Sequence, residues 1–169
     1  TPEVAASHPA RLLLSGPCGG AMAAEHLAHS LDEENLVAVD MGGTSFDVSL
    51  VRDKQATMVT EGQIDGCPVR LPMVEIRTIG AGGGSIARVD DAGRLRVGPE
   101  SAGAEPGPAC YGAGGERATV SDANLILGRL RPSAFLGGAM TLDRDTAAHA
   151  IGAEVGDPLG LTLEAAAEG

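Results

Sequence analysis

Two different hydrophobic patterns meet at a short glycine turn, and this junction constrains the fold more than any other feature. Residues 36–39 form a continuous apolar run that ends at Asp40, which is typical of a strand buried on both faces. From Phe46 to Leu50 apolar and polar residues alternate, which indicates a strand with one buried face. The junction predicts a strand-turn-strand hairpin whose glycine turn is exposed on the rim of a cleft.

Further helices and short strands are predicted around this hairpin. Helices are expected at residues 19–30, 120–129 and 143–151 and from Leu161 onward, with Ser121 or Asp122 capping the second and Asp143 the third. Strands are expected at residues 56–60, 73–79, 86–90 and 95–97, and a long loop at 99–115. These elements predict an α/β fold, with a strand meander and packing helices, in one partial domain over residues 1–169.

Composition excludes several classes of protein. The net charge of −11, from 12 basic and 23 acidic residues, provides no positive field for nucleic acid. No apolar run approaches the length of about 18 residues that crosses a membrane. The 3 cysteines are widely spaced, which favours a reduced, cytoplasmic protein. With 25 glycines but no Trp, the chain is expected to combine an aliphatic core with several closely approached loops.

The glycine turn carries the residue types that would hold a phosphorylated ligand. They are Asp40, Gly42, Gly43, Thr44, Ser45 and Asp47. The glycines leave no β-carbon between the backbone amides and a phosphate, and the two hydroxyls add donors. The two carboxylates would repel a bare phosphate, so they imply a Mg-nucleotide in which the cation lies between acid and phosphate. The alternative is a plain tight hairpin with an Asx-type turn.

This segment resembles the second phosphate loop of the actin, sugar-kinase and heat-shock-chaperone superfamily. In that loop an acid, two or three glycines, a hydroxyl residue and a second acid surround the nucleotide phosphates. Aligned to the chaperone form, Asp40 and Asp47 match the two acids, and Ser45 rather than Thr44 matches the hydroxyl.

Four ordered blocks narrow the resemblance to the hydantoinase A and oxoprolinase family. They are SGPCGG at 15–20, TIGAGGGS at 78–85, ESAGAEPGPACYG at 100–112 and DANL at 122–125. Two departures from the family pattern lie outside the turn. Cys18 replaces the usual Ala, and Arg88 stands where an aromatic residue is common.

The resemblance implies a lobe of an actin-like ATPase, with a ribonuclease H-like fold, in a subunit that opens a hydantoin-type or 5-oxoproline-type cyclic amide or imide with ATP. Asp40 and Asp47 would be catalytic and Mg²⁺-holding, while Gly42, Gly43, Thr44 and Ser45 would contact the nucleotide. Partners would be the remainder of the subunit and a hydantoinase B-type subunit. An earlier D-x-G-G-T-type loop and a later F-G-G-A-G-type adenosine segment would complete the site.

Two other functions stay open from the sequence. A related ATP-dependent ketone carboxylase would use the same turn with different substrate chemistry, and a non-catalytic nucleotide switch of the chaperone or actin kind would use it to drive domain closure.

Several weaker candidates have structural explanations beside functional ones. The glycine run at 80–85 is either a ligand loop or a structural turn. Cys110 is a nucleophile or, more in keeping with its surroundings, a buried thiol. His26 and His29 are three apart on a predicted helix, as metal ligands or as part of an exposed face. Asp122 and Asn124 lie near a helix start and are better explained as caps.

Overall fold

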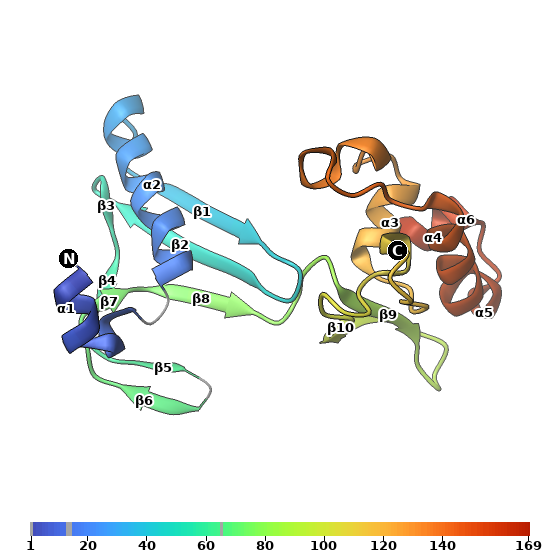
Figure 1. The fold of residues 1–169 in the computed structure, drawn as a ribbon, viewed down its shortest axis with the longest axis horizontal. Helices are drawn as coiled ribbons and strands as arrows, with labels where there is room; N and C mark the ends of the chain where they lie inside the picture. The colour runs from blue at the N-terminus through green and yellow to red at the C-terminus, as the bar shows by residue number, and fades with distance from the viewer. Residues whose placement is uncertain (1, 13–14, 65) are drawn as a thin grey trace. The chain divides into compact units, whose positions relative to one another are not determined.

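The structure is a computed structural model that describes residues 2–12, 15–64 and 66–169 of the 169-residue chain. The chain divides into two compact units (Figure 1). Unit 1 comprises Thr1–Asp40 and Asp47–Ile79, and unit 2 comprises Met41–Phe46 and Gly80–Gly169. The expectation of a single partial domain over residues 1–169 stays a prediction, and the units are described separately.

Unit 1 is built on a four-stranded sheet in which β1, β2 and β3 are neighbours in that order and β8 also pairs with β2. Two small antiparallel pairs, β4 with β7 and β5 with β6, complete its strands. The strands are β1 (Leu36–Met41), β2 (Phe46–Arg52), β3 (Gln55–Ala56), β4 (Met58–Val59), β5 (Gly62–Ile64), β6 (Cys67–Val69), β7 (Met73–Val74) and β8 (Ile76–Ile79). The helices are α1 (Pro2–Ser7), the 3₁₀ turn η1 (Pro9–Leu12) and α2 (Ser15–Leu31).

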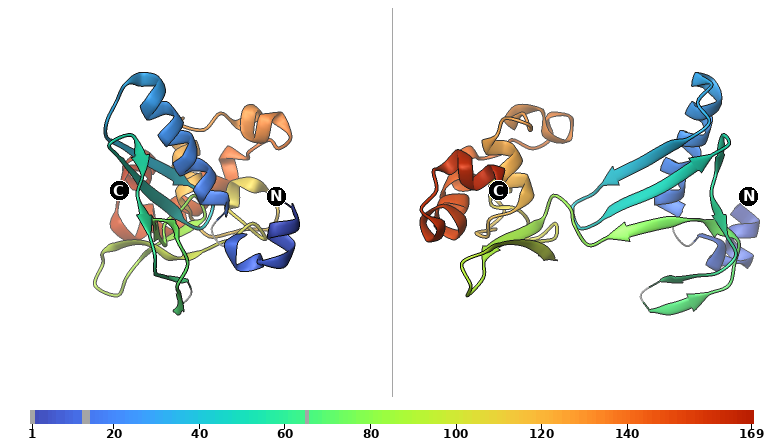
Figure 2. Two further views of the ribbon diagram at one scale, coloured as in Figure 1. Left: turned by 90° about the vertical axis from the view of Figure 1, so that its left-hand side faces the viewer. Right: turned by 180° about the vertical axis from the view of Figure 1, so that it is seen from behind.

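Helix α2 lies against the sheet of unit 1 (Figure 2). The contact is made by small residues: Ala24 and Ala28 are buried with Val51 of β2, and Leu36 and Ala38 of β1 pack against them. The helix begins at Ser15, four residues before the predicted start at residue 19. Alanine at these positions lets the helix backbone approach the sheet closely.

Strand β1 is not buried on both faces, so this expectation is wrong. Leu36 and Ala38 pack toward α2, whereas Val37 and Val39 on the opposite face are 63% and 61% exposed. The strand lies at the end of the path β1-β2-β3, and no described element covers its second face. The continuous apolar run correctly predicted a strand but not its environment in this chain.

Unit 2 combines one antiparallel hairpin with a group of short helices. The hairpin pairs β9 (Ser85–Val89) with β10 (Leu95–Ser101), as predicted. The helical elements are η2 (Ala109–Tyr111), α3 (Val120–Ile126), η3 (Pro132–Gly138), α4 (Arg144–Ile151), the π-helical turn η4 (Gly152–Gly156), α5 (Asp157–Leu159) and α6 (Leu163–Glu168). Their core is largely aliphatic, with Leu125, Ile151 and Val155 each at most 2% exposed.

Helix α3 starts at Val120, as predicted, but its capping residue and its end differ from the prediction. Its N-cap is Thr119 rather than Ser121 or Asp122, and the helix ends at Ile126 rather than at residue 129. Asp122 occupies the third helical position, where its carboxylate accepts hydrogen bonds from the N–H (2.9 Å) and hydroxyl (2.7 Å) of Thr119. The Asp122 N–H in turn donates to Thr119 Oγ1 at 3.4 Å, which completes a capping box. The prediction that Asp143 caps α4 is confirmed, because its side chain accepts from the N–H groups of Asp145 and Thr146.

The predicted long loop at 99–115 is partly ordered by Asp122. Its first residues extend β10 to Ser101, and η2 forms a short helical turn within it. Asp122 is fully buried and also accepts a hydrogen bond from the Cys110 N–H at 2.7 Å. One carboxylate therefore joins η2 to the start of α3.

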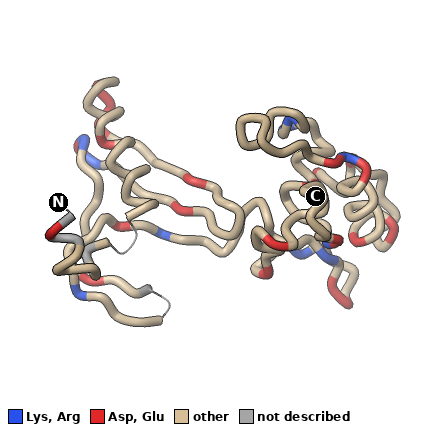
Figure 3. Tube along the Cα trace, in the orientation of Figure 1, with Lys and Arg blue, Asp and Glu red and all other residues tan. Residues whose placement is uncertain are grey.

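Charged residues occur in both units, and acidic positions are spread along the trace rather than gathered in one run (Figure 3). Among the helices described, none combines the length and apolar character required to cross a membrane.

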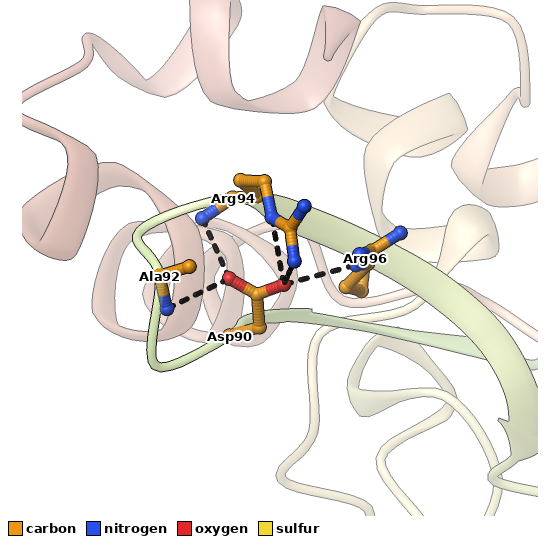
Figure 4. A network of polar contacts seen from close by, with 4 residues as sticks. All are labelled: Asp90, Ala92, Arg94 and Arg96. Carbon is orange, nitrogen blue, oxygen red and sulfur yellow. Dashed lines mark hydrogen bonds and ion pairs between the residues drawn. The ribbon is translucent and has the colours of Figure 1, made fainter.

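The turn of the β9–β10 hairpin is closed by an Asp90 carboxylate network (Figure 4). One oxygen accepts from the N–H groups of Ala92 and Arg94, each at 3.0 Å, and the other from the guanidinium groups of Arg94 (3.1 Å) and Arg96 (3.0 Å). These donors, led by the Arg94 backbone N–H, lower the pKa of Asp90 from 3.8 to about 2.

The Asp90 network should make hairpin stability depend on acid pH. Because the pKa is lower in the folded chain, the stabilisation is complete above about pH 4 and is lost as pH falls through about 2. We expect the Asp90 carboxyl carbon, followed by NMR, to titrate near pH 2. Asp90→Asn should abolish this part of the pH dependence. A midpoint at 3.8 would show that the network does not persist in solution.

Candidate functional site

The predicted strand-turn-strand hairpin is confirmed, and its turn belongs to unit 2. The turn is closed by a hydrogen bond from the Gly42 N–H to the Ser45 carbonyl oxygen at 2.8 Å. Gly42, Gly43 and Thr44 are exposed. No turn or loop hydrogen bond in the described part of the chain uses the N–H of Gly43 or Thr44. Two neighbouring backbone donors are therefore available to an anionic ligand.

The glycine run of residues 82–84 packs directly behind this turn. The Gly83 N–H donates to the Gly42 carbonyl oxygen at 2.9 Å, and the Gly84 N–H donates to the Gly43 carbonyl oxygen at 2.6 Å. A β-carbon at Gly82 would lie 2.7 Å from the Gly43 carbonyl oxygen, which leaves no room for one. Since both amides are already engaged, this contact supports the structural explanation of the 80–85 run.

The Ser101 hydroxyl, at the end of β10, contacts the glycine turn, and both belong to unit 2. Thr44 Oγ1 and Ser101 Oγ share a hydrogen bond at 3.4 Å, and Ser101 Oγ also accepts from the Gly103 N–H at 3.1 Å. The sequence did not single out Ser101, although it lies in the block at 100–112. Ser45, the predicted hydroxyl of the chaperone-type alignment, is partly buried.

The two acids that flank the turn in sequence belong to unit 1. Asp40 is exposed, whereas Asp47 is partly buried and accepts a hydrogen bond from Thr78 Oγ1 at 2.6 Å. Both acids border one groove of about 380 Å³ along α2 and β1, which is otherwise mainly apolar. Thr78 was not predicted as a site residue, but it opens the block at 78–85.

The donor set of Asp40 and Asp47 suits Mg²⁺ bound largely through water. Carboxylate oxygens are hard ligands, and Mg²⁺ in nucleotide sites commonly uses one or two of them and retains several waters. Across residues 2–12, 15–64 and 66–169, no group of three or more His, Cys, Asp or Glu side chains could form a metal site. His26 and His29 are both exposed on α2, in keeping with a solvated helix face.

The other candidates have structural roles. Burial raises the pKa of the Cys110 thiol far above its ordinary value, with a smaller contribution from the Asp122 charge, so the thiol stays protonated at neutral pH. This supports the buried-thiol explanation. Asp122 is the capping and loop-joining residue described above, and Asn124 Oδ1 accepts a hydrogen bond from Arg129 Nη1 at 3.2 Å.

Comparison with known proteins gives a consistent result along the whole chain. The profile of the family described as Hydantoinase/oxoprolinase matches residues 1–169. The chain is 46% identical over 155 residues to caprolactamase subunit alpha of Pseudomonas jessenii, covering 92% of this chain and 22% of that protein. It is 42% identical over 161 residues to acetone carboxylase beta subunit of Xanthobacter autotrophicus, covering 95% of this chain and 22% of that protein. It is 44% identical over 126 residues to 5-oxoprolinase of Saccharomyces cerevisiae, covering 73% of this chain and 10% of that protein.

Two solved structures are similar to this chain. A nucleotide-free structure of acetone carboxylase, from work on ATP-dependent acetone carboxylation, superposes with a TM-score of 0.80 at 41% identity over 90% of this chain and 22% of the other. The ATP-dependent caprolactamase from Pseudomonas jessenii superposes with a TM-score of 0.79 at 44% identity, over 91% of this chain and 22% of the other. The chain thus spans about a fifth of the length of these relatives.

Proposed function

This chain belongs to the hydantoinase/oxoprolinase family, and on that premise we propose that it is one part of an ATP-dependent hydrolase subunit. The substrate would be a cyclic amide or imide of the hydantoin or 5-oxoproline type, opened at its C–N bond. The chain would contribute the second phosphate loop of an actin-like ATPase lobe. Family relatives include a 5-oxoprolinase and a caprolactamase, and the latter is described as ATP-dependent.

One observation carries the phosphate-binding assignment. The exposed turn presents the unused N–H groups of Gly43 and Thr44. The carbonyl oxygens of Gly42 and Gly43 are held by hydrogen bonds from the N–H groups of Gly83 and Gly84. A hydrogen bond to a charged oxygen contributes about 1.5–3 kcal/mol. Two amides, assisted by the hydroxyls of Thr44 and Ser45, would therefore hold and orient a nucleotide phosphate.

The acids have a separate task in this proposal. Asp40 and Asp47 would hold Mg²⁺ through water, and the bound ion would offset the negative charge of the phosphates and their repulsion by the carboxylates. The Thr78 hydroxyl fixes one oxygen of Asp47 and leaves the other for the hydrated ion. Transfer of the γ-phosphoryl group from ATP to the amide oxygen, with ADP as the leaving group, would then activate an otherwise unreactive carbonyl carbon for attack by water. Cleavage of the C–N bond and release of inorganic phosphate would complete the hydrolysis.

The proposal extends to the assembly. Caprolactamase subunit alpha and acetone carboxylase beta subunit are named as subunits. We therefore propose that this chain acts together with the rest of a longer subunit and with a hydantoinase B-type partner.

A ketone carboxylase is the second candidate, because acetone carboxylase is nearly as similar as caprolactamase in sequence identity, 42% against 46%, and its TM-score is 0.80 against 0.79. The test is phosphate release by the full-length subunit with its partner, with cyclic amides or small ketones, each with and without bicarbonate. A hydrolase should respond to a cyclic amide without bicarbonate. A response that requires both ketone and bicarbonate would assign the carboxylase, and release unaffected by every substrate would favour the nucleotide switch.

A further inference from the structure

We propose that Gly83, confined between the glycine turn and Ser121 of α3, is a positioning residue for the phosphate-binding turn. This inference rests on the proposed function, since it concerns how the turn is held for catalysis. The residues involved all belong to unit 2.

A short relay of backbone hydrogen bonds runs from α3 to the turn. The Ser121 N–H, in the first turn of the helix, donates to the Gly83 carbonyl oxygen at 2.7 Å. The Gly83 N–H in turn donates to the Gly42 carbonyl oxygen at 2.9 Å. One peptide segment thus connects the helix start to the turn with no side chain between them.

The far end of the relay is anchored in the core. Ser121 is adjacent to Asp122, whose fully buried carboxylate holds both Thr119 and the Cys110 N–H. The start of α3 is therefore fixed by several hydrogen bonds. A displacement at Gly83 would be transmitted toward the exposed turn rather than into this anchored region.

The space around the glycine run distinguishes Gly83 from Gly82 and provides a test. A β-carbon at Gly83 would lie 2.7 Å from Ser121 Oγ, and among the described residues, apart from its two sequence neighbours, the only other atom within 4 Å would be the Gly42 carbonyl oxygen at 3.8 Å. The obstacle at Gly83 is therefore one removable hydroxyl. At Gly82 the obstacles are the carbonyl oxygens of Gly42 and Gly43, at 2.8 and 2.7 Å, which no side-chain change removes.

The experiment compares five variants of the full-length subunit with its partner: Gly83→Ala, Gly82→Ala, Ser121→Ala, Gly83→Ala/Ser121→Ala and Gly82→Ala/Ser121→Ala. Mg-ATP-dependent phosphate release gives kcat and KM, and thermal unfolding monitors the fold. Gly83→Ala should lower kcat/KM for ATP by about 100-fold, the loss that follows a misplacement of about 1 Å. Ser121→Ala should stay within about twofold of wild type, since it retains the backbone N–H of the relay. The kcat/KM of Gly83→Ala/Ser121→Ala should recover to within about fivefold of the wild-type value.

Recovery of kcat/KM in Gly83→Ala/Ser121→Ala distinguishes a positioning role from a general loss of stability. A general loss of stability caused by Gly83→Ala would persist when Ser121 is also replaced. Gly82→Ala should lower kcat/KM for ATP, and kcat/KM should not recover when Gly82→Ala is combined with Ser121→Ala. The proposal is overturned if Gly83→Ala retains wild-type kcat/KM, or if Gly83→Ala/Ser121→Ala is no better than Gly83→Ala. Should Gly83→Ala alone not fold, a folded and active double variant would support the proposal, and an unfolded one would overturn it.

Asp40→Asn separates this proposal from the function on which it rests. Loss of ATP turnover in Asp40→Asn together with normal turnover in Gly83→Ala would overturn the positioning role alone. Normal turnover and normal Mg-ATP affinity in Asp40→Asn would instead overturn the cation role that the proposed function assigns to Asp40.

Discussion

Asp40→Asn in the full-length subunit should lower ATP turnover by about 100-fold or more while leaving the fold intact. The substitution keeps the size of the side chain and removes the charge that would orient the cation. Changes in groups that merely support a metal ligand already cost about 10–100-fold, so loss of an acid facing the hydrated ion should cost at least as much. Asp40 is exposed, and its replacement leaves no buried group without a partner.

Two further substitutions sharpen this test. Asp47→Asn should have a milder effect, because an amide oxygen can still accept the hydrogen bond that Thr78 donates to Asp47. Asp53→Asn is the matched control. Asp53 is an exposed acid in the turn after β2, and its φ of 50° is one that Asn also tolerates. Wild-type turnover in Asp40→Asn would show that this carboxylate only shapes the turn.

The second large effect concerns residues 1–169 expressed alone, which should neither hydrolyse ATP nor bind it tightly. Available contacts are two turn amides, one or two hydroxyls and the two acids. At about 1.5–3 kcal/mol for each such bond before losses, they face an association cost of about 4–15 kcal/mol. Little net affinity should remain, since the family resemblance implies that another phosphate loop and an adenosine segment complete the site.

Calorimetry with Mg-ATP on the purified 1–169 chain tests this expectation. A dissociation constant near 1 μM corresponds to about 8 kcal/mol, and such a value would show that these residues form a complete site by themselves. The isolated chain should also self-associate. Leu27 and Leu31 of α2 and Val37 and Val39 of β1 are each at least 50% exposed and border one apolar groove.

Local patterns predicted the hairpin well because its determinants are local. The change from a continuous to an alternating apolar pattern fixes two strands, and the adjacent glycines fix the turn between them. The β9–β10 hairpin and the Asp143 cap were predicted for the same reason. Asp143, for example, caps α4 through the two residues that follow it closely in sequence.

Features that depend on distant residues could not be predicted in this way. The capping residue of α3 was mispredicted because Asp122 is not the N-cap itself: its carboxylate pairs with the true N-cap, Thr119, and accepts a hydrogen bond from Cys110, twelve residues earlier. The contact between the glycine run and the turn joins residues about forty positions apart, so the pattern at 80–85 could not distinguish a ligand loop from a backing segment. Exposure of β1 depends on what covers the second face of a sheet, which periodicity does not reveal.

The central claim is that the glycine turn holds nucleotide phosphates, and Gly43→Ala tests it most directly. A β-carbon at Gly43 would meet no atom of the described chain within 4 Å, so the substitution should leave the protein unchanged and affect only a ligand at the turn. Calorimetry on the full-length subunit should show Mg-ATP binding weakened at least about tenfold, or about 1.4 kcal/mol, with adenosine binding within about twofold of wild type. Unchanged affinity for Mg-ATP, or equal losses for both ligands, would contradict the account.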